Sequence, residues 1–320
     1  MPFKVNAELA AVLGKLSGGI DPHPPPKLGD VNARRTLIAP GIKALVGPNF
    51  PSDVRTKDYY TPSPDGHEIL LRWYHTDEQP QNPAVVYIHG GGMILGSVDD
   101  YHVLVAGYVA RTRVPFLSVE YRLAPEFPYP TPLNDIYAAV MWLYSKAKHL
   151  TVDPQRIAIM GDSGGGGLAA ATCLLARQRG GPRLAKMILL SPMLDDRTIV
   201  ADEHTSALAS WTAIDNETGW SAFLGPKRGQ QDVPETASPG RMRDAAGLPP
   251  AFVEVGELDL FRDEVIEFAA KYYKAGVGME LHVYPGCTHG FDLFSPESSS
   301  IAKRAFEVRD AAIMAIEAIE

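Results

Sequence analysis

The sequence predicts an α/β fold, in which a mostly parallel β-sheet is covered by helices on both faces. Short apolar runs rich in β-branched residues alternate along the chain with longer segments whose apolar residues recur at helical spacing. The run at 84–88 is nearly all apolar, as expected of a strand buried on both faces. With 320 residues, the chain can bury a large core as one domain, or as one domain with a lid.

The individual elements follow from these patterns. Strands are expected at 68–74, 84–88, 116–121, 157–160, 187–190, 251–255 and 280–284. Helices are expected between most of them, at 102–113, 133–147, 165–178 and 263–275, with a last one at about 300–318. Two more helical patterns, at 7–16 and 31–46, come before the first strand, and Pro40 should kink or break the second. They are separated by residues 21–26, which contain four prolines and cannot be helical.

The regular alternation stops between residues 195 and 247. Polar loops are expected there, around four large apolar residues: Leu208, Trp211, Trp220 and Phe223. A long insertion after a strand is a typical position for a substrate lid.

Composition excludes several classes of partner. The formal charge of -8 argues against nucleic acid or an anionic membrane as the main partner, and no apolar stretch reaches the roughly 18 residues of a membrane span. The two cysteines, Cys173 and Cys287, make neither a disulfide framework nor a metal-ligand cluster, and we expect no cofactor and no metal. The N-terminal residues lack the apolar centre of a signal peptide, which predicts a cytoplasmic location.

A glycine-bracketed serine follows the strand expected at 157–160. The residues Gly161, Ser163 and Gly165 form a G-x-S-x-G motif, and an alanine- and leucine-rich helix follows it. This strand–turn–helix context is typical of a nucleophile elbow. Side chains at the two glycines would collide across so sharp a turn, and the start of the helix favours negative charge that develops at the serine.

A second glycine motif follows the strand expected at 84–88. His89 is followed by Gly90, Gly91 and Gly92, whose bare amides can approach a ligand closely. Acyl transfer needs such amides already directed at the oxyanion, with another from the residue after the nucleophile. We therefore predict an oxyanion hole made by Gly91, Gly92 and Gly164, against the alternative of a plain glycine turn. His89 precedes the glycines and is expected to shape the loop.

A base and an acid must follow the serine in the order Ser, Asp or Glu, His. Of the nine histidines, His289 is the one in a glycine-flanked loop after a predicted strand beyond Ser163. His282 lies inside that strand and His204 lies in the expected lid. Asp259 is the favoured acid, because it follows the strand at 251–255. Its rivals are Glu257 and Asp263, and Asp263 is better placed to begin the next helix. Asp162 adjoins the nucleophile and is interpreted as structural.

These motifs together resemble those of the hormone-sensitive-lipase-like esterases, a branch of the α/β-hydrolases. The resemblance covers about residue 68 to the C-terminus and includes His89–Gly92, Tyr121–Glu126, Gly161–Gly165, Asp259–Asp263 and His289–Phe291. Gly164 stands where the family usually has alanine, and Leu260 where its acid motif often has proline. The resemblance implies an α/β-hydrolase fold with a helical cap, and that Asp259 orients His289. It also implies a catalytic core at 51–195 and 246–320 with a cap at 1–50 and 196–245. Some members form homodimers through the sheet edge.

The predicted function is hydrolysis of small-molecule carboxylic esters of short to medium acyl chain through an acyl-enzyme, with Ser163, Asp259 and His289 as the triad. Apolar candidates for the substrate pocket are Met93, Ile94, Leu208, Trp211, Phe223 and Phe291, each with ordinary packing as the alternative. A serine hydrolase acting on an amide, lactone or carbamate has the same triad and is not separated from an esterase by sequence. A non-catalytic binding protein is the other alternative, because the related plant gibberellin receptors use this scaffold after losing the histidine.

Overall fold

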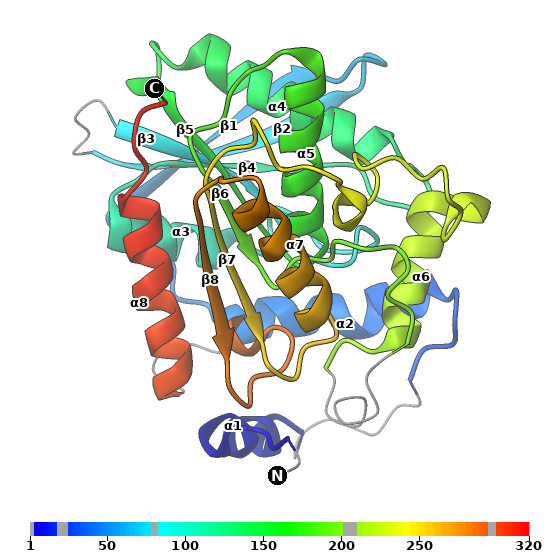
Figure 1. Cartoon of the computed structure of the whole chain (residues 1–320). Coiled ribbons are helices and arrows are strands. Elements are labelled where there is room, and N and C mark those ends of the chain that lie inside the picture. Colours follow the sequence, from blue (N-terminus) through cyan, green and yellow to red (C-terminus); the bar gives the residue numbers. More distant parts are fainter. Residues whose placement is uncertain (1–2, 18–24, 78–81, 201–209, 294–298, 320) are drawn as a thin grey trace.

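The computed structural model describes residues 3–17, 25–77, 82–200, 210–293 and 299–319, and the structural statements below refer to these residues. Their strands form one sheet in the order β1-β2-β4-β3-β5-β6-β7-β8 (Figure 1). Strands β4, β3 and β5 to β8 are parallel, whereas β2 is antiparallel to both β1 and β4. The bounds are β1 Val54–Pro62, β2 Glu68–Thr76, β3 Asn82–Ile88, β4 Phe116–Val119, β5 Val152–Asp162, β6 Met187–Leu190, β7 Ala251–Gly256 and β8 Met279–Tyr284. The predicted mostly parallel sheet is confirmed.

Helices cover both faces of this sheet, as predicted (Figure 1). One face carries α3 (His102–Thr112) and α8 (Ser300–Met314), which contact each other, and the other carries α4 (Thr131–Lys146), α5 (Gly164–Arg179) and α7 (Arg262–Lys274). The central strands β4, β6 and β7 are buried at every residue, because helices remove both of their faces from water. Short 3₁₀ helices are η2 Gly225–Lys227, η3 Pro239–Arg241 and η4 Phe291–Leu293.

Three elements differ from the sequence-based expectation. Strand β1 was not predicted, because its exposed polar residues carry little apolar alternation and it is fixed by pairing with β2. Helix α2 (Val31–Val46) continues through residue 40, so the expected break at Pro40 is wrong. Tertiary contacts of α2 outweigh the one backbone hydrogen bond that proline removes. Helix α6 (Ala213–Leu224) lies where loops were expected, and its Thr212–Asp215 capping box was the signal that could have found it.

The two N-terminal helices lie in different places. Helix α1 (Ala7–Ser17) packs beside the chain that follows β8, where the Asn6 amide donates to the Gly286 carbonyl at 2.8 Å. Helix α2 contacts α6 through the buried Arg34, whose Nε donates to Asp215 at 2.9 Å. Helix α2 therefore joins α6 to the core, and α1 supports the loop after β8. No helix in the described ranges has the length and apolar content needed to cross a membrane.

Candidate active site

The turn between β5 and α5 places Ser163 in a conformation that L-residues rarely adopt, with φ of 54° and ψ of -121°. Its amide donates to the Leu190 carbonyl at 2.8 Å, which ties the turn to β6. A Cβ at Gly161 would lie 2.4 Å from the Gly165 carbonyl oxygen, and one at Gly165 would lie 2.3 Å from the His89 carbonyl oxygen. Only glycine fits at either position, so the elbow predicted from the motif is present.

Three side chains from distant parts of the sequence meet above the sheet. Nε2 of His289 lies 3.0 Å from Oγ of Ser163, and Nδ1 of His289 lies 2.8 Å from Oδ2 of Asp259. Ser163, Asp259 and His289 follow the C-terminal ends of the parallel strands β5, β7 and β8, which meet at one edge of the sheet. The structure therefore brings together all three residues of the predicted triad.

The electrostatics of this hydrogen-bonded chain favour a base at the serine. The carboxylate of Asp259 is fully buried and accepts from the Phe261 amide at 3.0 Å, so its orientation is fixed. With Nδ1 donating to Asp259, the Nε2 lone pair is left to accept the Ser163 hydroxyl proton. Burial alone would lower the pKa of His289, but the charge and hydrogen bond of Asp259 outweigh it and raise that pKa above its ordinary value.

The rival candidates have other partners. Glu257 accepts from the Gly286 amide at 2.9 Å, and Asp263 lies in the first turn of α7 with its carboxylate on Arg262. His282 pairs with Glu280 on β8, and His204 lies outside the described residues. The geometry thus selects the acid and the base that the resemblance implied.

The glycine loop after β3 lies directly against the elbow. Gly91 and Gly92 have φ of 115° and 58°. A Cβ at Gly164 would lie 2.9 Å from the Gly92 nitrogen and 2.8 Å from the Met93 nitrogen, so these amides are next to the serine. Within the described ranges, no group accepts a hydrogen bond from the amides of Gly91, Gly92 or Gly164. The amides of Gly92 and Gly164 are therefore adjacent, Gly91 precedes Gly92 in the same loop, and all three amides are available to a ligand.

This loop is held by His89, which the sequence analysis expected to shape it, and by residues that sequence reasoning left without a role. The His89 ring is buried, its Nδ1 lies 2.9 Å from the Gly90 carbonyl oxygen, and it stacks on Tyr121 at 4.3 Å. The Tyr121 hydroxyl donates to the His89 carbonyl at 2.9 Å. Arg35 of α2 donates to the Ile94 carbonyl at 2.7 Å and pairs with Glu126. The Tyr121–Glu126 motif was recognised from the resemblance, and only the fold shows that it supports the oxyanion loop.

The candidate pocket residues differ in whether they contact the active site or pack elsewhere in the fold. The ring of Trp211 lies on Gly92, where a Cβ would be 2.7 Å away, and 6.3 Å from the His289 ring. Met93 and Ile94 are buried in the oxyanion loop. Phe223 packs edge-on against Tyr129 and Trp220 inside the region of α6, and Phe291 packs with Leu9, Tyr284 and Cys287. Leu208 lies outside the described residues. Trp211 is thus the aromatic pocket candidate that adjoins the triad.

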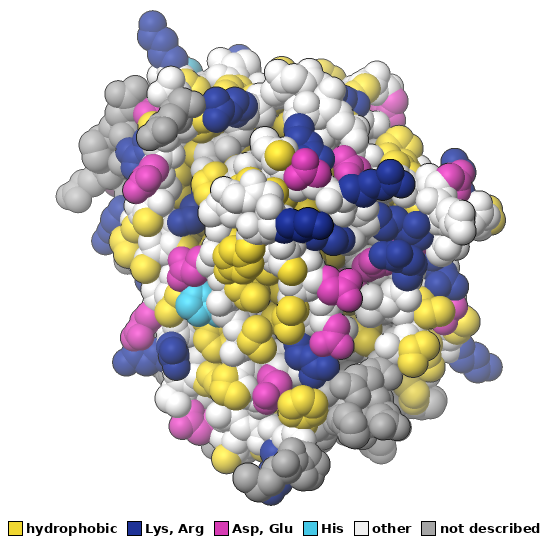
Figure 2. Space-filling model, viewed as in Figure 1, with side chains coloured by type: hydrophobic (Ala, Val, Ile, Leu, Met, Phe, Trp, Pro, Cys, Tyr) yellow, Lys and Arg dark blue, Asp and Glu magenta, His cyan; other side chains and the backbone are white. Residues whose placement is uncertain are grey.

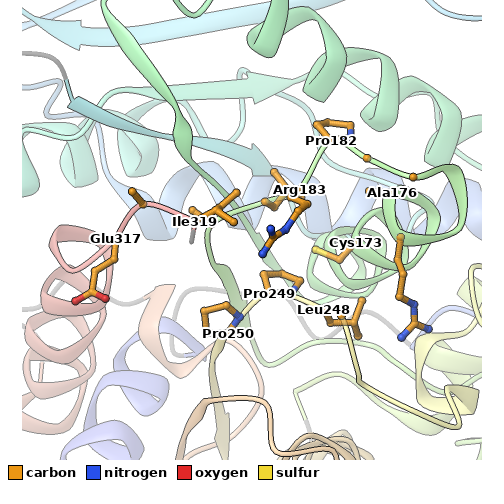
Figure 3. A pocket seen from close by; sticks show the side chains of 16 residues that line it. Cys173, Ala176, Pro182, Arg183, Leu248, Pro249, Pro250, Glu317 and Ile319 are labelled. Atoms are coloured by element: carbon orange, nitrogen blue, oxygen red, sulfur yellow. The ribbon is translucent and has the colours of Figure 1, made fainter.

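A separate pocket of about 700 Å³ opens at the other end of the sheet. Figure 3 shows Cys173, Leu248, Pro249, Pro250 and Ile319 among the residues around it. Pro250 immediately precedes β7, whereas Ser163 follows the C-terminal end of the parallel strand β5. This pocket therefore lies away from the triad.

Comparison with known proteins agrees with the fold and the site. A family model described as the α/β-hydrolase fold matches residues 85–293, which is more than half of the chain. The chain belongs to the α/β-hydrolase family. Within it, the chain belongs to the hormone-sensitive-lipase-like branch that its motifs indicated.

Several named relatives and solved structures are similar to the chain. The carboxylesterase NlhH of Mycobacterium tuberculosis is 37% identical over 216 residues, covering 67% of each chain. The carboxylic ester hydrolase LipN of the same species is 32% identical over 282 residues, covering 85% of this chain and 73% of that one. The structure of a bacterial heroin esterase matches with a TM-score of 0.86 at 33% identity, covering 97% of both chains. A thermostable esterase from Pseudomonas putida matches with a TM-score of 0.86 at 27% identity, covering 99% of both.

Proposed function

We propose that this protein is a serine carboxylesterase with Ser163, His289 and Asp259 as its catalytic triad. The observation that carries the proposal is the continuous hydrogen-bonded chain from the serine through the imidazole to a buried carboxylate, beside three available amides. Relatives and structural neighbours named as esterases support ester hydrolysis as the reaction. The protein hydrolyses carboxylic esters.

The mechanism proceeds through an acyl-enzyme. Oγ of Ser163 bonds to the ester carbonyl carbon while His289 takes its proton, and the amides of Gly91, Gly92 and Gly164 stabilise the oxyanion. When the bond to the alcohol oxygen breaks, His289 returns the proton to the leaving alcohol. Water then attacks the acyl carbon with His289 again as base, which releases the acid and frees the serine. Asp259 orients the imidazole and stabilises its charged form.

The substrate is a small-molecule ester of short to medium acyl chain. Helices α2 and α6 form the cap, because α2 contacts both α6 and the oxyanion loop and Trp211 precedes α6 beside the triad. The close contact of this cap with the oxyanion loop is the reason to propose a short to medium acyl chain. We expect p-nitrophenyl butyrate to be hydrolysed faster than the palmitate ester, and the reverse order would contradict the closed cap.

Replacing the nucleophile tests the activity itself. Ser163→Ala is expected to lower kcat for p-nitrophenyl butyrate on the order of 10⁶-fold. It should also abolish labelling by a fluorophosphonate probe, while circular dichroism stays unchanged. Near-normal hydrolysis by the variant would contradict the assignment, and failure of the wild-type protein to react with the probe would favour a binding protein. An amide, a lactone or a carbamate turned over faster than every ester would move the function to that class of serine hydrolase.

The surface also bears on assembly. Strand β8 is an edge strand, and Ile266, Tyr273 and Val283 are exposed on or beside it. Figure 2 shows hydrophobic side chains among charged ones over this face. A homodimer through this edge is the assembly we propose, and light scattering that gives the mass of one chain would exclude it. The cytoplasmic location stays a prediction.

A further inference from the structure

A buried polar cluster connects four elements near His289. Arg309 of α8 is fully buried, and its Nη2 donates both to Glu254 of β7 and to Asp292 of η4, the latter at 2.8 Å. Its Nη1 donates to the hydroxyl of Tyr108 on α3. We call these four residues the Arg309 cluster. One guanidinium thus holds the strand that leads to Asp259 and the segment that follows His289.

This cluster is expensive to bury. Two carboxylates share one guanidinium away from water, and such an arrangement rarely stabilises a fold more than well-packed apolar residues would. The pKa of Glu254 is raised to about 7, chiefly because burial disfavours its charge. A cluster of this composition therefore calls for an explanation other than stability.

Its position supplies that explanation. Before His289, two hydrogen bonds join the loop that carries the histidine to the loop that carries Asp259. The Leu258 amide donates to the Cys287 carbonyl at 2.9 Å, and the Gly286 amide donates to the Glu257 carboxylate. After His289, within the described ranges, Phe291 and Leu293 pack against apolar side chains, and the Asp292 carboxylate accepts a hydrogen bond from Arg309. The imidazole must meet Ser163 and Asp259 at once, so a shift of this segment would lengthen one of two short contacts.

We propose that Asp292, held by Arg309, is a positioning residue for His289, fixing the segment after the base and favouring the charged imidazolium that forms during catalysis. This inference rests on the proposed function, because it concerns the base of that reaction. The charge of Asp259, its hydrogen-bonded partner, and that of Asp162 at the end of β5 also raise the pKa of His289. Asp292 adds a further charge that raises this pKa, and Arg309 holds its carboxylate in place.

The decisive variant is Asp292→Asn in the full chain, with Asp310→Asn as the matched control. Asp310 of α8 also pairs with an arginine, Arg111, and its side chain is 12% exposed against 13% for Asp292. Arg111 is 37% exposed, whereas Arg309 is fully buried. For Asp292→Asn we expect kcat for p-nitrophenyl butyrate to fall about 10-fold with KM changed less than about 2-fold. We also expect the midpoint of the acid limb of kcat/KM to shift to lower pH by about half a pH unit. The control should change neither kcat nor the acid limb.

A second measurement does not depend on turnover. The titration of His289 is followed by NMR in protein labelled with ¹⁵N-histidine, the resonance being identified by its loss in His289→Gln. Asp292→Asn should lower this midpoint by about half a pH unit. Arg309→Lys keeps the positive charge but loses the planar group that binds both carboxylates, and it should lower kcat less than Asp292→Asn does.

An unchanged midpoint, or an equal change in Asp310→Asn, would overturn the inference. If Asp292→Asn does not fold, the pH dependence of kcat/KM is measured for Arg309→Lys instead. An acid limb identical to that of the wild type would then overturn the inference. A wild-type protein without esterase activity would instead refute the proposed function, while the NMR titration would still test the role of Asp292.

Discussion

The serine side and the histidine side of the active site are held by different kinds of contact. On the serine side, Gly161 and Gly165 bring backbone atoms so close that an added Cβ would lie 2.3–2.4 Å from a carbonyl oxygen. On the histidine side, side-chain hydrogen bonds hold the residues: Asp259 on His289, and Asp292 on Arg309. Backbone packing tolerates no added atom, whereas a side-chain network tolerates isosteric change and responds to pH. The two sides should therefore fail differently.

Apart from removal of the nucleophile itself, the largest effect is expected from the histidine side. Asp259→Asn keeps the shape of the acid but favours the wrong imidazole tautomer, so kcat should fall about 10³–10⁴-fold, the scale known for this change in another triad. The raised pKa of His289 depends on the charge of Asp259, so the remaining activity should persist to lower pH. The pH–rate profile of Asp259→Asn measures the pH at which this activity is lost. An acid limb that stays in place would show that Asp259 does not set the charge of the base.

The serine side should respond through its backbone. Gly165→Ala is expected to lower activity about 10²-fold or more, because the new Cβ would displace the elbow or β3. It should also lower the free energy of unfolding by about 1–3 kcal/mol, measured by urea unfolding. The control is Gly107→Ala in α3, whose Cβ would meet only the movable end of Arg111 at 3.1 Å. Equal losses in the two variants would show that the collision at the elbow is not decisive.

A smaller effect separates the elbow from the oxyanion loop. Gly164→Ala installs the residue usual in the family, yet its Cβ would lie 2.8–2.9 Å from the nitrogens of Gly92 and Met93. The loop must then move by a few tenths of an ångström, so we expect kcat to fall about 10-fold, less than the 10²–10³ for losing a donor. Affinity for a phosphonate transition-state analogue should fall with kcat while KM stays near its original value. A variant as active as the wild type would show that the loop yields freely.

The last effect concerns the dependence of stability on pH. Asp162 accepts from the Tyr87 hydroxyl at 2.7 Å, and burial, only partly offset by that bond, raises its pKa to about 7. The folded state therefore binds this proton more tightly than the unfolded chain, and the resulting stability is lost as pH rises from about 4 to about 7. Asp162→Asn has no proton to lose. The difference in free energy of unfolding between the variant and the wild type should therefore shift in favour of the variant between pH 5 and pH 8, by a few kcal/mol at most. Urea unfolding at the two pH values measures this, and an equal difference at both would contradict it.

The sequence by itself determined what depends on local chemistry. The glycines around Ser163 and the apolar run before it specify the elbow, because side chains at Gly161 or Gly165 would collide across the turn. The buried strand at 84–88 and the glycines at 90–92 likewise specify a loop of bare amides. The position of His289 after a strand, in a glycine-flanked loop, was sufficient to identify the candidate base.

The tertiary structure decided what depends on pairing between distant segments. Strand β1 exists because β2 pairs with it, and α2 continues past residue 40 while Arg34 and Arg35 fix it to α6 and the oxyanion loop. The choice of Asp259 over Glu257 required the position of the imidazole, because sequence spacing allowed either carboxylate. The link between Asp292 and Arg309 has no local signal, since a side-chain hydrogen bond between separate elements leaves no periodicity in either segment.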